Sequence, residues 1–418
     1  MNSTDLPFLY IALPVIDENE LLPRFMDCIL EQTYRRFKVF VCVNQPDEWW
    51  DDPGHLNVCE SNQRTLEYLE GIPGIEIAII DRSSRGKGWN GRKHGVGWAR
   101  KVMMDKISEV AEGDDIILSL DADVTFSTEY LYSIAETFSK FPDAVALSVP
   151  YFHRPVSDPA ACHAILRYEI YMRYYSLNLW RIQSPYTFTA LGSAIACPVW
   201  AYRAVGGITP KMSGEDFYFL QKLRKYGKML FWNPQKVYPE ARFSSRVYFG
   251  TGPAMIKGND GDWTSYPLYS SRFFDEISET YQLIPSFYKK TGVTSVTNFL
   301  KDHLKEDDPF HLLRENAKEV NQFVRSCHEK FDGLRILQYL KFRQTNEPHA
   351  DEECLKEYLE RFFGRKTIKE LGIEEQSFSF VSADLVQLEK IRTFLMEQEE
   401  LLQISSEPSL PGQQLPAV

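Results

Sequence analysis

The sequence predicts an α/β fold with a mostly parallel central sheet flanked by helices, followed by a helical C-terminal region. Over the first 150 residues, short apolar runs alternate with helical patterns, which is typical of strand–helix–strand units in a parallel sheet. Beyond about residue 270, charged amphipathic helical patterns dominate. The chain has 418 residues, enough for one large domain and an appended region.

Five apolar runs are expected to form strands of the sheet, at residues 8–13, 37–43, 75–80, 115–120 and 144–149. Helical spacing predicts the intervening helices, at about residues 18–32, 62–69, 91–110 and 131–138. Ligands of such sheets bind beyond the carboxyl ends of the strands. Polar features fall at three of those ends, at residues 14–18, 44–45 and 121–123.

The second half of the chain is expected to be less regular. Helices are predicted at about residues 160–181, 199–205 and 213–226, a strand at 229–232, and a loop-rich stretch at 238–253. The apolar segment 187–204 is expected to be buried core. We expect three parts: a first domain over residues 1–270, a helical region over 271–404, and a disordered tail over 405–418, which is rich in Ser, Pro and Gln.

Composition excludes several classes of protein. With 47 basic and 58 acidic residues, the net charge is −11, which does not suit a nucleic-acid-binding surface. No signal peptide and no transmembrane segment are expected. The seven cysteines are scattered and form no Cys-x-x-Cys pair, so reduced thiols in a cytoplasmic protein are expected.

The motif Asp121-Ala122-Asp123 follows the fourth predicted strand directly. Alternate residues of an extended chain point the same way, so the two carboxylates can share one side. Two carboxylates can hold a hard divalent cation, with phosphate oxygens and water completing its coordination. The alternative is that Asp121 and Asp123, with Ser127, cap the next helix.

A second acidic pair, Glu215-Asp216, follows Gly214 and opens a predicted helix. A carboxylate placed there can act as a general base toward a hydroxyl group. The structural alternative is a capping box from Ser213 to Asp216, which suits acids near a helix N-terminus. The helix N-terminus is expected to keep the pKa of Asp216 low.

Eight basic residues lie between residues 82 and 106, against one acid, Asp105, and glycines are interleaved with them. Cations and flexible backbone before a helix suit a diphosphate. The Walker arrangement of an ATPase is absent. Arg85 and Lys87 are the candidate contacts, and a solvated surface is the alternative.

In this order, these motifs resemble family 2 glycosyltransferases of the GT-A fold, over about residues 8–252. The family's Pro-x-x-Asn-Glu signature resembles residues 14–18, with Asp17 in place of Asn, and its Gln-x-Tyr helix end resembles residues 32–34. Its glycine and Ala-Arg element resembles residues 95–100. Its metal motif resembles residues 121–123, and its acceptor-side Glu-Asp pair resembles Glu215-Asp216.

The resemblance implies transfer of a sugar from a nucleotide-diphosphate sugar to an acceptor hydroxyl with inversion, assisted by Mg²⁺ or Mn²⁺. It makes Asp123 the main metal ligand and Asp121 a contact to the ribose or the metal. It also implies that Pro14 and Glu18 line the nucleoside pocket and that Asp216 takes the acceptor proton.

The sequence departs from the family at the end of the second strand, where Asn44-Gln45 replaces the usual acidic residues. Asn44 is therefore the expected contact to the nucleobase, and an amide both donates and accepts hydrogen bonds, so the base need not be uracil. The late motif and membrane helices of processive synthases are absent, which favours single-sugar transfer. Arg242 and Arg246 are candidates for a loop that closes over the diphosphate, with an ordinary surface loop as the alternative.

Two other functions compete. Residues 118–125 also match the nucleophile motif of haloacid-dehalogenase-type phosphatases, with Asp121 as nucleophile and Asp123 as general acid. That motif usually sits on a first strand, whereas here it follows the fourth. The second rival is a catalytically inactive GT-A-like scaffold that binds a partner through its helical region.

The acceptor is expected to be a saccharide or a lipid-linked acceptor. A lipid-linked acceptor would bring the protein to a membrane surface, although the C-terminal helices are too acidic to favour an anionic membrane. The tyrosine-rich stretch 168–180 could stack on a sugar ring, and core packing is the alternative.

Overall fold

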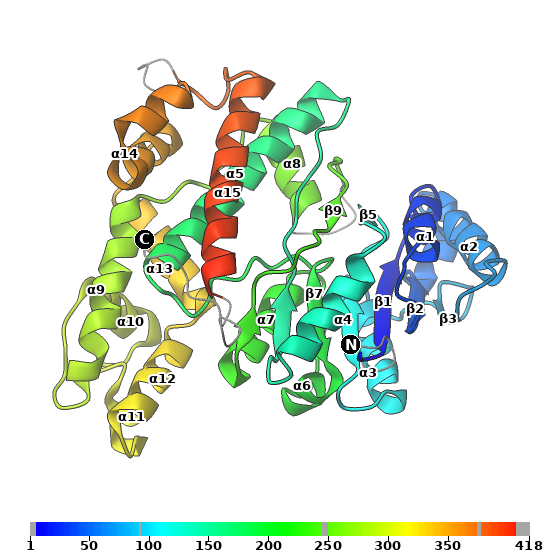
Figure 1. Cartoon of the computed structure of the whole chain (residues 1–418), viewed down its shortest axis with the longest axis horizontal. Coiled ribbons are helices and arrows are strands. Elements are labelled where there is room, and N and C mark those ends of the chain that lie inside the picture. Colours follow the sequence, from blue (N-terminus) through cyan, green and yellow to red (C-terminus); the bar gives the residue numbers. More distant parts are fainter. Residues whose placement is uncertain (1–5, 92, 245–249, 374–377, 407–418) are drawn as a thin grey trace. The chain divides into compact units, whose positions relative to one another are not determined.

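The computed structural model of the protein describes residues 6–91, 93–244, 250–373 and 378–406 (Figure 1). The chain divides into two compact units. The first comprises residues 1–165, 188–259 and 403–418, and the second comprises residues 166–187 and 260–402. Residues 166–187, which precede the predicted helical region, thus group with residues 260–402.

The first unit is built on a seven-stranded sheet with the strand order β3-β2-β1-β4-β7-β6-β8. Its pairs β1–β2, β1–β4, β2–β3 and β6–β8 are parallel, and β7 is antiparallel to β4 and β6. The strands are Leu9–Val15 (β1), Phe37–Asn44 (β2), Ile77–Arg82 (β3), Ile116–Ser119 (β4), Ala146–Ser148 (β6), Ile195–Pro198 (β7) and Met229–Leu230 (β8). The predicted α/β fold with a mostly parallel sheet is confirmed.

The central strands of this sheet are buried on both faces. In β1, Leu9, Ile11 and Leu13 have no exposed surface, and neither does the intervening Ala12. Near-continuous apolar sequence is characteristic of a parallel strand that helices cover on both sides. By contrast, every residue of the edge strand β3 is partly exposed.

The helices of the first unit flank the sheet (Figure 1). They are Leu22–Leu30 (α1), Leu56–Glu70 (α2), Val96–Val110 (α3), Tyr130–Lys140 (α4), Val199–Ala204 (α6), Glu215–Tyr226 (α7) and Thr251–Asn259 (α8), together with the 3₁₀ turn Asp47–Asp51. Helix α3 begins at Val96 rather than near residue 91, because Gly95 has a φ of 103°, which a helix does not allow.

One helix and three strands of the first unit were not predicted. Strand β7 lies inside the apolar segment predicted only as core, and α8 begins inside the predicted loop-rich stretch. Strands Val124–Thr125 (β5) and Tyr238–Pro239 (β9) form a separate antiparallel pair. A strand of two residues is too short to show an alternating apolar and polar pattern, so it is recognised only by the strand with which it pairs.

The second unit is helical, as predicted for the C-terminal region. It contains the part of α5 (Pro159–Arg181) from residue 166 onward. Its other helices are Ser271–Phe287 (α9), Ser295–Leu304 (α10), His311–Asn316 (α11), Val320–Lys330 (α12), Gly333–Asn346 (α13), Asp351–Glu370 (α14) and Leu385–Ser406 (α15), the last of which crosses the unit boundary. Helix α15 extends two residues into the predicted tail, and residues 407–418 lie outside the described ranges.

The tyrosine-rich stretch of α5 contributes to the core of the second unit. Tyr174 is buried, packs edge-on against Tyr358, and donates its hydroxyl to the carbonyl oxygen of Tyr269 at 2.7 Å. For Tyr174, the structure supports core packing over an exposed sugar platform.

A buried cluster of charges joins α5 to α15 within the second unit. Arg173 contacts Glu169 at 2.8 Å and Glu399 at 2.5 Å, and Arg392 contacts Glu169 at 3.2 Å. Ser176 donates its hydroxyl to Glu399 at 2.6 Å. The two arginines and two glutamates are buried and balance one another in charge, as buried ions require.

The seven cysteines form no disulfide, and six of them are buried. Within the described ranges, no helix combines the length and the apolar character needed to cross a bilayer.

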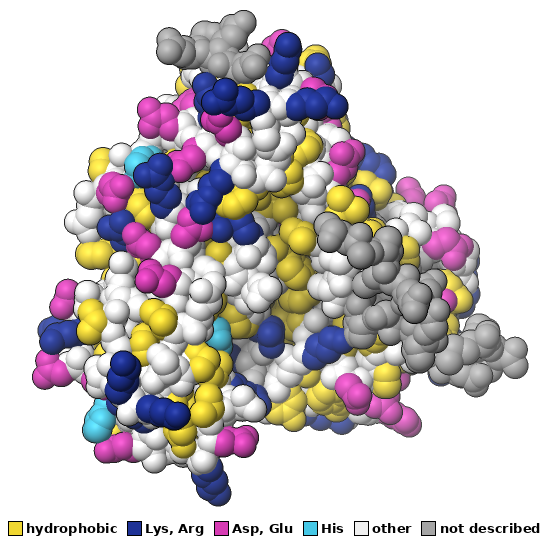
Figure 2. All heavy atoms as spheres, turned by 60° about the vertical axis from the view of Figure 1, so that its left-hand side comes forward, with side chains coloured by type: hydrophobic (Ala, Val, Ile, Leu, Met, Phe, Trp, Pro, Cys, Tyr) yellow, Lys and Arg dark blue, Asp and Glu magenta, His cyan; other side chains and the backbone are white. Residues whose placement is uncertain are grey.

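Figure 2 shows Lys and Arg side chains interspersed with Asp and Glu side chains, so the face in view has mixed charge.

Candidate active site

The turn that follows β4 carries Asp121 and Asp123 at the carboxyl end of that strand. The backbone N–H of Leu120 still bonds to Ala12 of β1 at 3.2 Å, and the chain then turns before β5. Neither acid flanks a helix, since β5 intervenes and the residue preceding α4 is Glu129. The capping alternative for this motif is therefore wrong.

Arg100 of α3 connects this turn to the second acidic pair. Its guanidinium donates Nη2 to Asp121, Nη1 to Glu215, and Nε to the Ser119 hydroxyl at 3.1 Å. The side chain is only 5% exposed. Ser119 in turn donates to the carbonyl oxygen of Gly192 at 2.7 Å. The buried Arg100 guanidinium therefore links the C-terminal end of β4 to the N-terminal end of α7.

Gly192 makes room for this guanidinium. A Cβ atom at this position would overlap the Arg100 side chain. Substitution of Gly192 would therefore disturb the Arg100 guanidinium, and with it the contacts to Asp121 and Glu215.

Glu215 and Asp216 open α7, after Gly214 in a left-handed conformation with a φ of 74°. Gly214 is the N-cap residue and no side chain caps the helix, so the alternative of a capping box from Ser213 to Asp216 is wrong. The Asp216 carboxylate instead accepts the N–H of Phe217 at 2.8 Å.

The electrostatics of Asp216 also differ from expectation. Burial and the adjacent Glu215 carboxylate raise the pKa of Asp216 to about 7, although Arg100 acts in the opposite direction. The helix N-terminus was expected to keep this pKa low. Burial of a carboxylate beside two other acids outweighs that effect.

Asp123 lies in a second ion cluster, with Glu18 and Arg242. Arg242 Nη2 contacts Glu18 Oε1 at 2.5 Å and Asp123 Oδ2 at 3.1 Å. Glu18 comes from the segment after β1, and Arg242 follows β9. The side chains of Arg242 and Asp123 are 28% and 25% exposed, whereas that of Glu18 is 8% exposed. Arg246 lies outside the described residues.

Pro14 and Asn44 lie within neighbouring strands. Pro14 is buried in β1, in register with Cys42 of β2. Asn44 is 1% exposed, donates Nδ2 to the carbonyl oxygen of Val15 at 2.9 Å, and accepts the indole N–H of Trp89 at 3.1 Å. Both ends of the Asn44 amide are thus used within the fold.

Arg85 and Lys87 lie on the surface beside the edge strand β3. Arg85 pairs with Asp51 at 2.8 Å and lies over the ring of Trp50, with the guanidinium carbon 5.5 Å from the ring centroid. Lys87 pairs with Asp81 at 2.9 Å. Nearby acids therefore neutralise these two predicted diphosphate contacts.

A metal centre made wholly of protein ligands is not found among the described residues, where no group of three or more His, Cys, Asp or Glu side chains could hold an ion. Mg²⁺ and Mn²⁺ can be held by one or two carboxylates, with phosphate oxygens and water supplying the rest. The Asp121 and Asp123 carboxylates fit that limited requirement. Each also accepts from an arginine.

Sequence reasoning did not identify Arg100 as a site residue, although a signal was present. On α3, Arg100 shares the buried face with Met103, Met104 and Ile107. A single arginine on an otherwise apolar helix face indicates a buried acidic partner. The sequence does not reveal which acids those are.

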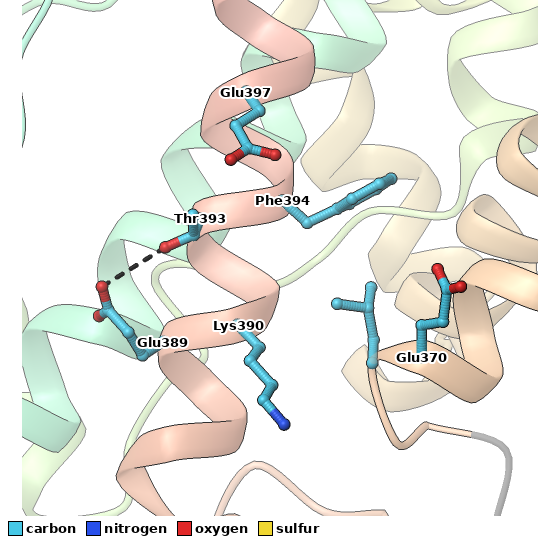
Figure 3. Close-up of a pocket in the computed structure, with 7 residues that line it drawn as sticks. Glu370, Glu389, Lys390, Thr393, Phe394 and Glu397 are labelled. Carbon is cyan, nitrogen blue, oxygen red and sulfur yellow. Dashed lines mark hydrogen bonds between the residues drawn. The ribbon is translucent and has the colours of Figure 1, made fainter.

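A separate pocket of about 300 Å³ lies in the second unit (Figure 3). It is lined by Glu370, Leu371, Glu389, Lys390, Thr393, Phe394 and Glu397. None of the predicted site residues belongs to it, so it is distinct from the two arginine clusters.

No protein-family model and no curated protein matches the chain. Among solved structures, it is similar to S. aureus TarS in complex with UDP-GlcNAc, with 14% identity, a TM-score of 0.41, and coverage of 78% of this chain and 91% of that chain. It is also similar to the mannosyltransferase PcManGT from Pyrobaculum calidifontis in complex with GDP-Man and Mn²⁺, with 13% identity, a TM-score of 0.40, and coverage of 96% and 88%.

Proposed function

We propose that this protein is a glycosyltransferase that moves a sugar from a nucleotide-diphosphate sugar to an acceptor hydroxyl with inversion, with Mg²⁺ or Mn²⁺ as cofactor. The observation that carries the proposal is the meeting of Asp121 and Glu215 on one buried guanidinium, Arg100. A turn suited to a metal–diphosphate complex is thereby held beside Asp216, a carboxylate suited to accept a proton.

In this proposal Asp216 is the general base. A pKa of about 7 places it close to physiological pH, where a base combines a useful ionised fraction with enough basicity. As the acceptor oxygen bonds to the anomeric carbon, the bond from that carbon to the diphosphate breaks, and the hydroxyl proton passes to Asp216. Glu215, fixed by Arg100, holds the start of α7 in place and raises the pKa of Asp216.

Asp123 would be the main ligand of the divalent cation, and Asp121, which Arg100 already pairs, would contact the ribose or the metal. A bound Mg²⁺ or Mn²⁺ supplies electrostatic stabilisation for the negative charge that grows on the departing diphosphate. Arg100, which also donates to the Ser119 hydroxyl, orients Asp121 from the buried side.

The nucleoside would lie at the carboxyl ends of β1 and β2, near Pro14 and Glu18. Asn44 would support the wall of this pocket, since its amide joins Val15 to Trp89. Arg85 and Lys87 would reach the diphosphate only after exchanging their partners Asp51 and Asp81.

The acceptor we propose is the hydroxyl of a saccharide or of a lipid-linked saccharide. A reducing compartment such as the cytoplasm suits seven cysteines without a disulfide. Screening nucleotide sugars for slow hydrolysis by the protein would identify the donor.

Thermal denaturation with a panel of nucleoside diphosphates, with and without Mn²⁺, tests the proposal. One nucleotide should raise the melting temperature only when Mn²⁺ is present, since a ligand at 100 times its Kd stabilises a protein by about 2.7 kcal/mol. Asp123→Ala should abolish the shift. Asp143→Ala, which changes an exposed acid after α4, should leave it intact.

Failure of every nucleotide to shift the melting temperature would count against a glycosyltransferase. Hydrolysis of simple phosphate esters that Asp121→Asn abolishes would favour the phosphatase instead. Full nucleotide binding without any transfer or donor hydrolysis would favour an inactive scaffold.

A further inference from the structure

The position of Arg242 is fixed by backbone pairing. Strands β5 and β9 pair Val124 with Pro239, and the N–H of Glu240 donates to the carbonyl oxygen of Asp123 at 2.9 Å. Arg242 follows two residues later, so its side chain starts close to the Asp123 carboxylate. The Glu240 side chain is held separately, by Arg24 at 2.9 Å.

Glu18 is also held by its backbone. Its carbonyl oxygen accepts the N–H groups of Leu21 at 3.1 Å and Leu22 at 2.9 Å, which places the carboxylate at the start of α1. Its side chain is only 8% exposed, so its charge needs a nearby cation. Arg242 supplies that cation and reaches Asp123 with the same nitrogen.

The consequence concerns the divalent cation that Asp123 is proposed to hold. The Arg242 guanidinium lies 3.1 Å from Asp123 Oδ2 and forms an ion pair with it. The metal would have to bind this same carboxylate. A metal ion and an arginine on the same carboxylate would repel each other at short range, because both are positive. The two cations therefore compete for Asp123.

We propose that Arg242 is an exchangeable counter-ion: it pairs with Asp123 and Glu18 in the ligand-free protein, and it leaves Asp123 when a divalent cation binds with a nucleoside diphosphate. The inference rests on the proposed function. Once released, the guanidinium lies beside the incoming phosphates, with which arginine forms strong, charge-assisted hydrogen bonds. Arg242 thus opposes binding of the metal alone and favours binding of the metal–nucleotide complex.

The test measures two affinities that should change in opposite directions in Arg242→Gln. Mn²⁺ titration of the protein alone, followed by electron paramagnetic resonance, should show about tenfold tighter binding, which corresponds to about 1.4 kcal/mol. Titration of the nucleoside diphosphate at saturating Mn²⁺ should show weaker binding, by about tenfold on the same scale.

Two further variants test whether the change in affinity comes from Arg242 itself or from the loss of any positive charge. Arg154→Gln removes a nearby exposed arginine that lies over the Tyr238 ring, with the guanidinium carbon 4.0 Å from the centroid, and should change neither affinity. Arg242→Lys keeps the positive charge, so its Mn²⁺ affinity should stay near that of the wild type. Melting temperatures of all variants show whether each is folded.

Unchanged or weaker Mn²⁺ binding by Arg242→Gln would overturn the inference, as would tighter nucleotide binding by that variant. A matching gain in Mn²⁺ affinity in Arg154→Gln would also overturn it, since net charge alone would then be the cause. If the wild type binds no nucleoside diphosphate at all, the proposed function fails. The Mn²⁺ titration of the protein alone still decides whether Arg242 competes with the metal.

Discussion

At the scale of single residues, Arg100 determines the geometry of the candidate site. Its guanidinium is buried and donates hydrogen bonds to Asp121, Glu215 and Ser119. Glu215 is 1% exposed, and a buried carboxylate without a partner is costly. The Arg100 guanidinium is therefore needed to keep the Glu215 carboxylate buried, and the cluster locks the turn after β4 to the start of α7.

The raised pKa of Asp216 predicts a pH-dependent activity. A base must be deprotonated to accept a proton, so kcat/KM for transfer should rise with pH and level off above about 7. An acid with its ordinary pKa would already be ionised at pH 5, and no rise would then be seen between pH 5 and 7. A pH profile of initial transfer rates measures this.

Asp216→Asn should keep nucleotide affinity and lose transfer by about 10²–10⁴-fold, which is the usual contribution of a general base. Glu109→Gln, which changes an exposed acid on α3, should leave both unchanged. Full transfer activity in Asp216→Asn would remove Asp216 from the base role.

Gly192→Ala should destabilise the first unit. The new methyl group would overlap the Arg100 guanidinium, and overpacking of this kind typically costs about 1–3 kcal/mol. Urea denaturation followed by tryptophan fluorescence would measure the loss. Gly113→Ala is the control, because its Cβ would lie 3.9 Å from the nearest atom, Trp200 Cβ, which is an ordinary contact. Equal stability of the two variants would contradict this role for Gly192.

At the scale of elements, the second unit holds α5 against α15 with buried ions rather than with apolar contacts alone. The arrangement specifies one register of the two helices, because a shift along either axis would leave buried charges unpaired. Both Arg173 and Arg392 contact Glu169, so Glu169 is the central acid of the cluster.

Arg392→Met should therefore lower the free energy of unfolding by about 3–5 kcal/mol, since it removes one partner from a buried ion cluster. Lys390→Met makes the same kind of change two residues away at an exposed position, where an effect within about 0.5 kcal/mol is expected. Chemical denaturation monitored by circular dichroism compares them. A small loss in Arg392→Met would show that the cluster contributes little.

At the scale of the whole molecule, the candidate site belongs to one unit. Asp121, Asp123, Glu215, Asp216 and the two arginines that contact these acids all lie in the first unit. The second unit has its own buried core, which includes Phe273, Phe323 and Tyr339. The proposed donor site is therefore contained within the first unit.

Hydrogen exchange with mass spectrometry should show this division. A nucleoside diphosphate with Mn²⁺ should slow exchange after β1, after β4 and at the start of α7, because bound ligand suppresses local opening. Exchange in α9 to α14 should stay unchanged. Protection confined to the helical unit would place the nucleotide elsewhere, and Asp123→Ala under the same conditions should lose the protection.

The sequence by itself located the parallel strands β1, β2 and β4 and the acidic motif that follows β4. Continuous apolar runs mark strands buried on both faces, and they located β1, β2 and β4 to within about two residues. Their alternation with helices fixes parallel pairing, so the ends of β1 and β4 had to share one edge. Polar residues placed directly after those strands could therefore be recognised as site candidates.

Tertiary structure alone decided which charges meet. Arg100 and Glu215 are 115 positions apart, and Arg242 and Glu18 are 224 positions apart. No local period encodes such pairs, because helix and strand patterns report only which face is buried. The same limit hid β7 and the β5–β9 pair, and it hid the raised pKa of Asp216, which arises from burial and the neighbouring acid. The local sequence pattern thus predicts which strand or helix end a side chain follows. The packing of distant segments decides which residue it contacts and at what pH it ionises.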